Sequence, residues 1–324
     1  MHIFLTTITN FEKYMYDNSI AETTPPGVLS IARWEKYFEL CKPKVVLLIV
    51  FTAIVGMLLS TQGMPPWDTM LFATLGIGLA SASGAAINQL VEQRIDAIME
   101  RTRLRPLPHG DMDTNSALFF ALSIGVFSIL ILVFLVNTLT ALLTFISLIG
   151  YAVIYTMFLK RSTPQNIVLG GAAGAAPPLL GWVAITGEIH SEALLLFLII
   201  FIWTPPHFWA LAIRRRDEYA KAGIPMLPVT HGVPFTKLQI LLYTIMLVAV
   251  TMLPFITQMS GLIYLAGAIA LGIGFLRYAI SLYRSDSDSL AMKTFGYSIF
   301  YLNLLFAFLL ADHYARVFLR AYIL

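Results

Sequence analysis

A stripe of oxygen-bearing side chains closes one of the apolar segments of this chain. Asn88, Glu92 and Asp96 follow one another at steps of four residues. In a helix, four residues advance about 400° around the axis, so these side chains share one face over about 12 Å. Oxygen ligands in that arrangement suit Mg²⁺, which keeps part of its water shell and bridges carboxylates to substrate phosphates. The stripe therefore predicts a metal site at the mouth of a helix.

Basic side chains follow the stripe directly. Arg101, Arg103 and Arg105 alternate with other residues in the next turn of chain. Arginine makes bidentate contacts with phosphate oxygens, so these residues can hold a diphosphate that the metal neutralises. Taken alone, the arginines are ordinary flanking residues of a membrane helix. Two carboxylates that end an apolar span beside three cations are a poor anchor, and the combination favours a metal and diphosphate site.

A second polar group lies inside a later apolar segment. His207 follows Pro205 and Pro206, and paired prolines bend or break a membrane helix where its backbone lines a cavity. A lone buried histidine is often a hydrogen-bonded structural residue, and the alternatives are an axial haem ligand or a proton-handling group. Asp217, at the end of this segment, can supply a carboxylate to a second metal or pair with Lys221 one turn later.

Two further sets of residues have a structural and a functional interpretation. Lys160 and Arg161 end another apolar segment, where they either extend to the membrane surface or contact a phosphate. Trp203, Phe208 and Trp209 can stabilise a positive charge through their ring faces, although most aromatic residues in membranes only pack.

The elements that must position these residues are membrane spans. The chain has 324 residues, of which 58% are hydrophobic and 12% are charged, with a mean hydropathy of +0.78. This composition excludes an ordinary soluble domain and a disordered chain. The single Cys41 permits no internal disulfide. A helix needs about 20 apolar residues to cross a bilayer, and nine stretches qualify: residues 45–61, 70–90, 116–136, 139–158, 167–186, 193–213, 238–257, 262–282 and 295–312.

The distribution of positive charge predicts the orientation of these spans. All but two of the 21 Lys and Arg residues fall on one side of the nine-span arrangement, and the exceptions are Arg316 and Arg320. Positive loops stay cytoplasmic, so we expect a bacterial cytoplasmic membrane protein with a cytoplasmic N-terminus. We expect residues 1–42 to form a cytoplasmic segment, 43–315 the nine-helix transmembrane domain, and 316–324 a short tail. We expect neither a signal peptide nor a transit helix in the first 42 residues, because they lack the apolar core of the one and the arginine-rich pattern of the other.

Small residues interrupt several of the spans. They gather in residues 81–86 and 170–176, and Gly170 and Gly174 form a Gly-x-x-x-Gly spacing. This spacing is typical of close helix packing in lipid, and the alternative is room for a substrate tail.

The motif from Asn88 to Leu107 resembles the first acidic motif of the UbiA superfamily of intramembrane prenyltransferases. The segments 160–163, 170–178, 203–213 and 222–228 are similar to the branch of this superfamily that acts on haem. Quinone-type members usually carry Asn-Asp-x-x-Asp-x-x-x-Asp and an Asp-rich second motif, whereas Gln89, Glu92 and His207 stand here. Both departures match the haem branch. The resemblance implies an all-α polytopic membrane protein, with about nine helices around a central cavity that opens to the cytoplasm.

The resemblance also implies a reaction and its site. Farnesyl diphosphate and haem B would give haem O and diphosphate, with a hydroxyl from water and with Mg²⁺ as the divalent cation. Catalytic roles are then expected for Asn88, Glu92, Asp96, His207 and Asp217, and metal ligation for Asn88, Glu92, Asp96 and Asp217. Substrate contacts are expected from Arg101, Arg105, Lys160, Arg161, Arg214, Trp203, Phe208, Trp209 and His231, and His231 competes with His207 for haem. The expected partners are the lipid bilayer and a haem-copper oxidase assembly or haem A synthase, with no nucleic acid.

Three alternatives compete with this interpretation. Another quinone or aromatic prenyltransferase would act on a phenolic acid instead of haem. A haem or small-molecule transporter explains the hydrophobicity, but not a metal-type stripe followed by arginines. A purely structural subunit fails for the same reason.

Overall fold

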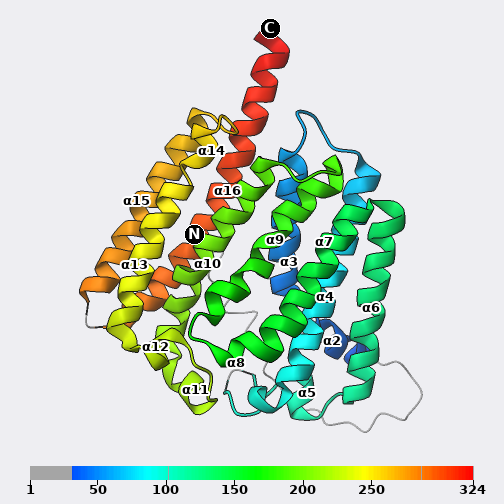
Figure 1. Cartoon of the computed structure of the whole chain (residues 1–324), viewed down its shortest axis with the longest axis vertical. Coiled ribbons are helices and arrows are strands. Elements are labelled where there is room, and N and C mark those ends of the chain that lie inside the picture. The colour runs from blue at the N-terminus through cyan, green and yellow to red at the C-terminus, as the bar shows by residue number, and fades with distance from the viewer. Residues whose placement is uncertain (1–30, 101, 286, 324) are drawn as a thin grey trace. The chain divides into compact units, whose positions relative to one another are not determined.

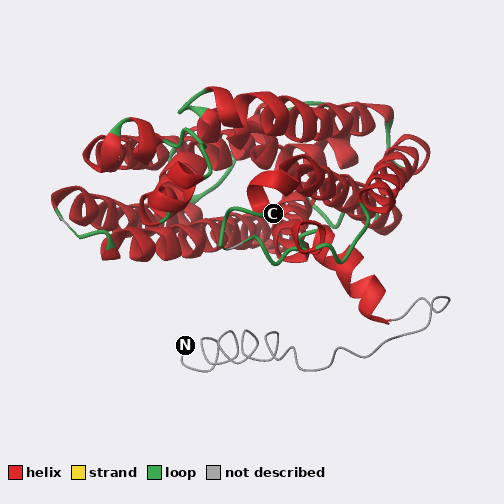
Figure 2. Cartoon of the chain, turned by 90° about the horizontal axis from the view of Figure 1, so that it is seen from below, coloured by secondary structure: helices red, strands yellow, loops and turns green. Residues whose placement is uncertain are grey.

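Every regular element in the described residues is a helix. The computed structural model describes residues 31–100, 102–285 and 287–323. The described residues from Lys36 onward belong to one compact unit. The elements are α2 (Ile31–Leu40), α3 (Pro43–Leu59), α4 (Trp67–Asp96), α5 (Pro106–His109), α6 (Thr114–Leu135), α7 (Thr138–Ile149), the π-helix η1 (Gly150–Leu159), α8 (Lys160–Ser162), α9 (Asn166–Thr186), α10 (Ser191–Arg214), α11 (Arg216–Lys221), α12 (Leu227–Thr230), α13 (Gly232–Val250), α14 (Leu253–Ile256), α15 (Leu262–Arg284) and α16 (Ser289–Ile323). Figure 2 shows these helices and the loops that join them. The all-helical prediction is confirmed.

The helices include the expected membrane spans. Eight are long and apolar enough to cross a membrane, and α3 with the helix before it forms a bent pair that makes a ninth. Each of the nine predicted stretches falls on one of these spans. Because successive spans cross in opposite directions, α4, α8 and α10 end on the same side of the membrane. Figure 1 accordingly shows α5, α8, α11 and α12 together at one end of the long helices.

Small residues bring α3 and α9 into direct backbone contact. A Cβ built on Gly181 would overlap the carbonyl oxygen of Ala53, and one built on Gly56 would overlap that of Pro178. The predicted role of small residues in close packing is confirmed at Gly170, where a Cβ would overlap the ring of Tyr155. Gly174 differs, because a Cβ there would meet nothing within 4 Å.

Helix α10 stays helical through Pro205 and Pro206, so the expected break at these prolines is wrong. Prolines are tolerated inside a membrane helix when neighbouring helices and hydroxyl side chains support the backbone. Here α10 packs against α9, α13 and α16, and Thr204 donates a hydrogen bond to the carbonyl of Ile200. His207 is therefore presented by a continuous helix.

Helix α6 exposes large apolar side chains. Phe119, Phe127 and Phe134 are 77%, 59% and 76% exposed. An apolar face of this kind is unfavourable in water and stable against lipid tails. The packing thus supports the same conclusion as the composition: this is a multi-pass membrane protein.

Asp312 ties α16 to the start of α15. Its buried carboxylate accepts hydrogen bonds from the backbone N–H groups of Gly261 (2.5 Å) and Tyr264 (3.2 Å). It also pairs with Arg316, whose guanidinium donates to the backbone carbonyls of residues 258 and 259. These contacts give Arg316 a local role, which explains how this cation can lie away from the predicted positive side.

Candidate active site

The predicted stripe is present on the last turns of α4. Asn88, Glu92 and Asp96 are 3%, 4% and 2% exposed. Buried carboxylates are costly unless a positive charge compensates them. The surroundings of the stripe must therefore supply that charge.

Three cations from distant parts of the chain each bind one member of the stripe. Lys42 donates to the amide oxygen of Asn88 (2.6 Å), and Lys160 forms an ion pair with Glu92. Arg105 pairs with Asp96 through Nη1 and Oδ2 (2.6 Å). Charge-assisted bonds of this kind are stronger than neutral ones. Three basic side chains face two carboxylates, and burial lowers the pKa of Lys42 to about 7, so the cluster has one positive charge available for an anion when Lys42 is protonated.

Local backbone features place these cations. Lys42 adopts a left-handed conformation (φ 52°) directly before Pro43 begins α3. Arg105 precedes the short helix α5, and Lys160 follows the π-helix η1. The wider turn of η1 also carries Thr156, whose hydroxyl accepts a hydrogen bond from the Asn88 amide (3.3 Å). Rare π-helical turns occur frequently at functional sites, and this one faces the stripe.

Other predicted charged residues lie elsewhere or outside the described part of the chain. Arg101 lies outside the described residues. Arg161 is exposed on α8. Asp217 is 85% exposed by its side chain and pairs with Arg216 (3.5 Å), and not with Lys221, among the described residues.

The second predicted group lies between α10 and α16. His207 is stacked between Trp203, at a centroid distance of 4.2 Å, and Phe295, at 4.6 Å. Its Nδ1 lies 2.6 Å from the hydroxyl of Ser298. The indole N–H of Trp203 donates to the backbone carbonyl of Ser298 (2.9 Å). The imidazole is thus held on both faces and at one edge.

The remaining predicted aromatic and histidine residues have separate surroundings. Trp209 is buried and meets Tyr243 edge to face at 5.2 Å. Phe208 is half-buried against the same core. His231 is exposed, bonds to the hydroxyl of Thr230 (2.9 Å) and stacks on a ring of α13.

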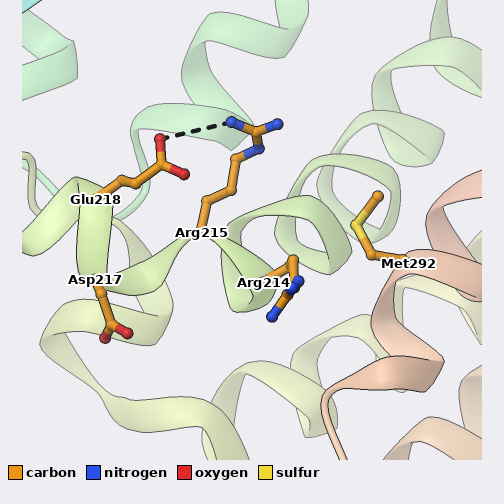
Figure 3. A pocket seen from close by; sticks show the side chains of 5 residues that line it. All are labelled: Arg214, Arg215, Asp217, Glu218 and Met292. Atoms are coloured by element: carbon orange, nitrogen blue, oxygen red, sulfur yellow. Dashed lines mark ion pairs between the residues drawn. The ribbon is translucent and has the colours of Figure 1, made fainter. Parts of the chain in front are cut away.

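A cavity of about 430 Å³ lies at the end of α10 (Figure 3). Arg215 pairs with Glu218 across it (3.5 Å), and Asp217 and Met292 complete the lining. Arg214 is exposed here and has no ion pair among the described residues. Its guanidinium is therefore free to bind an anion.

One apolar core connects the two groups. Met99, three residues beyond Asp96, packs in the same buried cluster as Trp209 and Ile213 of α10. The end of α4 and the end of α10 are therefore neighbours within this unit.

A family model described as the UbiA prenyltransferase family matches residues 49–305. The chain belongs to this family. A relative from Thioalkalivibrio sulfidiphilus, named Protoheme IX farnesyltransferase, is 68% identical over 284 residues, which cover 88% of this chain and 94% of the relative. A relative of the same name from Nitrosococcus oceani is 62% identical over 290 residues, covering 90% and 97%.

Solved structures agree on the fold. A digeranylgeranylglyceryl phosphate synthase has a TM-score of 0.76 at 20% identity and covers 88% of this chain and 100% of its own. A UbiA homologue from Archaeoglobus fulgidus, bound to GPP and Mg²⁺, has a TM-score of 0.59 at 14% identity and covers 85% and 99%.

The stripe of this UbiA family member fits a divalent cation that binds together with a phosphate. Among the residues that the structure describes, no group of three His, Cys, Asp or Glu side chains gathers to form a complete metal cage. The stripe instead supplies two carboxylates and one amide, all buried and on one face. Such a partial oxygen set is typical of Mg²⁺ sites, in which water and substrate phosphates complete the coordination.

Sequence reasoning missed three residues of this UbiA site. Lys42 counted only as a topological charge, although its place directly before an apolar span could have indicated a buried role. Thr156 and Ser298 had no signal, because each is one of several hydroxyl residues in an apolar segment. All three are identified by contacts with residues far away in the chain.

Proposed function

We propose that this chain transfers a farnesyl group from farnesyl diphosphate to a vinyl group of haem B and so forms haem O. The observation that carries this proposal is its 68% identity to a protein named Protoheme IX farnesyltransferase, over nearly the whole of both chains. The site supports it, since a buried oxygen stripe with surplus cations lies beside a helix that holds a histidine.

The reaction breaks one carbon–oxygen bond and forms one carbon–carbon and one carbon–oxygen bond. The bond between the farnesyl carbon and oxygen breaks, and its electron pair leaves with the diphosphate. The π electrons of the vinyl group then form the new carbon–carbon bond. Water adds to the resulting cation and loses one proton. The oxygen that remains is the hydroxyl group of haem O. An apolar interior keeps bulk water from the allylic cation until the vinyl group has reacted.

The first part of the proposal concerns the stripe. Asn88, Glu92 and Asp96 would hold Mg²⁺, which neutralises the leaving diphosphate when bound. The support is their burial on one face and the nature of their donor atoms. Asp217 would serve a second cation, because its exposed side chain in the first turn of α11 is accessible.

The second part concerns the diphosphate. Lys42, Lys160 and Arg105 are each bonded to one stripe oxygen. On substrate binding, these three side chains would exchange stripe oxygens for phosphate oxygens, which keeps every buried charge compensated. Preorganised cations at the point where negative charge develops lower the barrier to ionisation. Arg101 and Arg161 would contribute further contacts to the same group.

The third part concerns haem. His207 would orient the porphyrin, so that one vinyl group meets the allylic carbon. Arg214 lies seven residues later, two turns along the same face and about 10 Å away, and its free guanidinium would bind a propionate. Trp203, Phe208 and Trp209 would contact the substrates, and the exposed His231 would meet incoming haem.

The fourth part concerns place and organisation. The positive residues on one side favour the bacterial inner membrane with a cytoplasmic N-terminus and a cytoplasmic mouth. Residues 43–315 would form the catalytic domain, between an N-terminal segment of residues 1–42 and a tail of 316–324. Because haem O must be carried onward in the membrane, a haem A synthase or an oxidase assembly would receive it.

The decisive experiment supplies purified protein in sealed proteoliposomes with haem B, a phenolic acid, labelled farnesyl diphosphate and Mg²⁺. We expect a labelled haem product whose mass equals both substrates plus water minus diphosphate. Glu92→Gln should abolish it, whereas the matched variant Glu100→Gln, at an exposed site, should keep it. Label appearing on a phenolic acid and none on haem would favour the quinone-type alternative, and translocated but unmodified haem would favour a transporter.

A further inference from the structure

The hydrogen-bond pattern around His207 identifies which of its ring nitrogens carries a proton. The hydroxyl of Ser298 has two close neighbours, each at 2.6 Å: the backbone carbonyl of Phe295 and Nδ1 of His207. A carbonyl oxygen can only accept. The single hydroxyl proton must therefore point to the carbonyl, because two oxygens at this distance without a proton between them would repel each other.

The contact with Nδ1 must then run the other way. Ser298 Oγ, having donated its proton, can only accept, so Nδ1 of His207 carries a hydrogen and donates it. In a neutral imidazole with a hydrogen on Nδ1, Nε2 holds the free lone pair. No carboxylate pairs with His207 among the described residues, so the neutral form is the one expected inside a membrane helix.

Ser298 controls the orientation of the ring as well as its proton. Its backbone carbonyl accepts from the indole of Trp203, and that indole stacks on the imidazole at an interplanar angle of 18°. Phe295, one turn earlier on α16, covers the other face at 24°. Rotation that exchanged Nδ1 and Nε2 would break the bond to Ser298, so the lone pair keeps one direction.

We propose that Ser298 is a positioning residue that fixes His207 with its hydrogen on Nδ1 and presents Nε2 to the iron of the haem substrate. This proposal rests on the proposed function for its haem, but the assignment of the proton does not. Histidines that bind metals usually donate their other ring N–H to an acceptor, which fixes the ring and raises its basicity. Here the acceptor is the hydroxyl oxygen of Ser298, which donates its own hydrogen to the carbonyl of Phe295.

The test compares Ser298→Ala with Thr294→Val. Thr294 lies one turn earlier on α16, is equally buried, and donates its hydroxyl hydrogen to the carbonyl of residue 290. Both variants remove one buried hydroxyl from the same helix, and only one of them touches His207. Ser298→Thr, which keeps a hydroxyl, tests rescue.

The first readout needs neither haem nor activity. Nitrogen-15 spectra of histidine-labelled protein, assigned with His207→Gln, should report the hydrogen on Nδ1 in the wild type and in Thr294→Val. Ser298→Ala should yield a mixture of both tautomers. A hydrogen on Nε2 in the wild type, or unchanged spectra in Ser298→Ala, would overturn the proposal.

The second readout is the Soret band during a haem titration. We expect the Kd for haem to rise about tenfold or more in Ser298→Ala, with recovery in Ser298→Thr and no change in Thr294→Val. An altered tautomer with unaltered haem affinity would refute the link to iron. A wild type that neither binds nor farnesylates haem would refute the proposed function instead, while the nitrogen spectra would still decide the role of Ser298.

Discussion

The buried pair of Glu92 and Lys160 allows the needs of folding to be separated from those of chemistry. The two side chains are 5% and 16% exposed. Removing one partner of a buried pair costs about 3–5 kcal/mol, whereas replacing both by apolar residues is often neutral. Lys160→Met leaves two cations against two carboxylates, and Glu92→Leu leaves three cations against Asp96 alone. We therefore expect about 3 kcal/mol of destabilisation for the first and about 5 kcal/mol for the second.

The double variant should recover most of this stability and none of the activity, because it removes a metal ligand together with a phosphate contact. Unfolding in mixed detergent, followed by tryptophan fluorescence, measures the free energies, and the labelled-haem assay measures turnover. The exposed Lys293→Met controls for the loss of a lysine. The charge argument fails if Lys160→Met is as destabilising as Glu92→Leu, or if the double variant is no more stable than Glu92→Leu.

Three further outcomes follow from the structure. Gly181→Val should prevent accumulation of folded protein, because the new side chain would overlap the backbone of α3. Gly174→Ala should be tolerated, and size-exclusion chromatography of the two purified variants measures how much of each is folded. EDTA should stop product formation and Mg²⁺ restore it, and turnover that continues in excess EDTA would contradict the metal site. The hydrogen bond from Lys36 holds the pKa of Asp111 below its usual value. The pair therefore stabilises the fold fully at pH values above the unfolded-state pKa, and this stabilisation is lost as the pH falls through the lower folded-state pKa. Because the pair is exposed, its effect is at most about 1 kcal/mol, and melting of Asp111→Asn against wild type should differ at neutral pH and converge in acid.

The sequence predicted what local patterns determine. Nine spans followed from runs of apolar residues, and the stripe followed from a spacing of four on one helix. The partners of the stripe could not be predicted in this way, because Lys42 lies 46 residues from Asn88 and Lys160 lies 68 residues from Glu92. The π-helix η1 had no signal either. It depends on which carbonyl each N–H reaches after packing, and no residue type specifies that choice.

The break expected at Pro205 and Pro206 failed for a related reason. Proline removes a donor from its own helix, but the cost depends on what neighbouring helices supply, and α10 is enclosed by three of them. A continuous α10 has a functional consequence. Trp203 and His207 lie on either side of the two prolines, and the unbroken helix keeps them one turn apart, as their stacking requires.

In the proposed reaction, charged residues bind the diphosphate end of the prenyl substrate and apolar residues bind its farnesyl chain. The cations and the stripe gather where α4 ends and α8 begins, so the diphosphate would bind at the mouth of the membrane domain. The farnesyl chain is apolar and must extend inward from that point. In the proposed arrangement haem would join the same site along α10, whose end packs with the chain beyond Asp96. The allylic cation would then form at the boundary, near enough to the mouth for the diphosphate to leave and for one water to enter, and far enough inside for the vinyl group to react first.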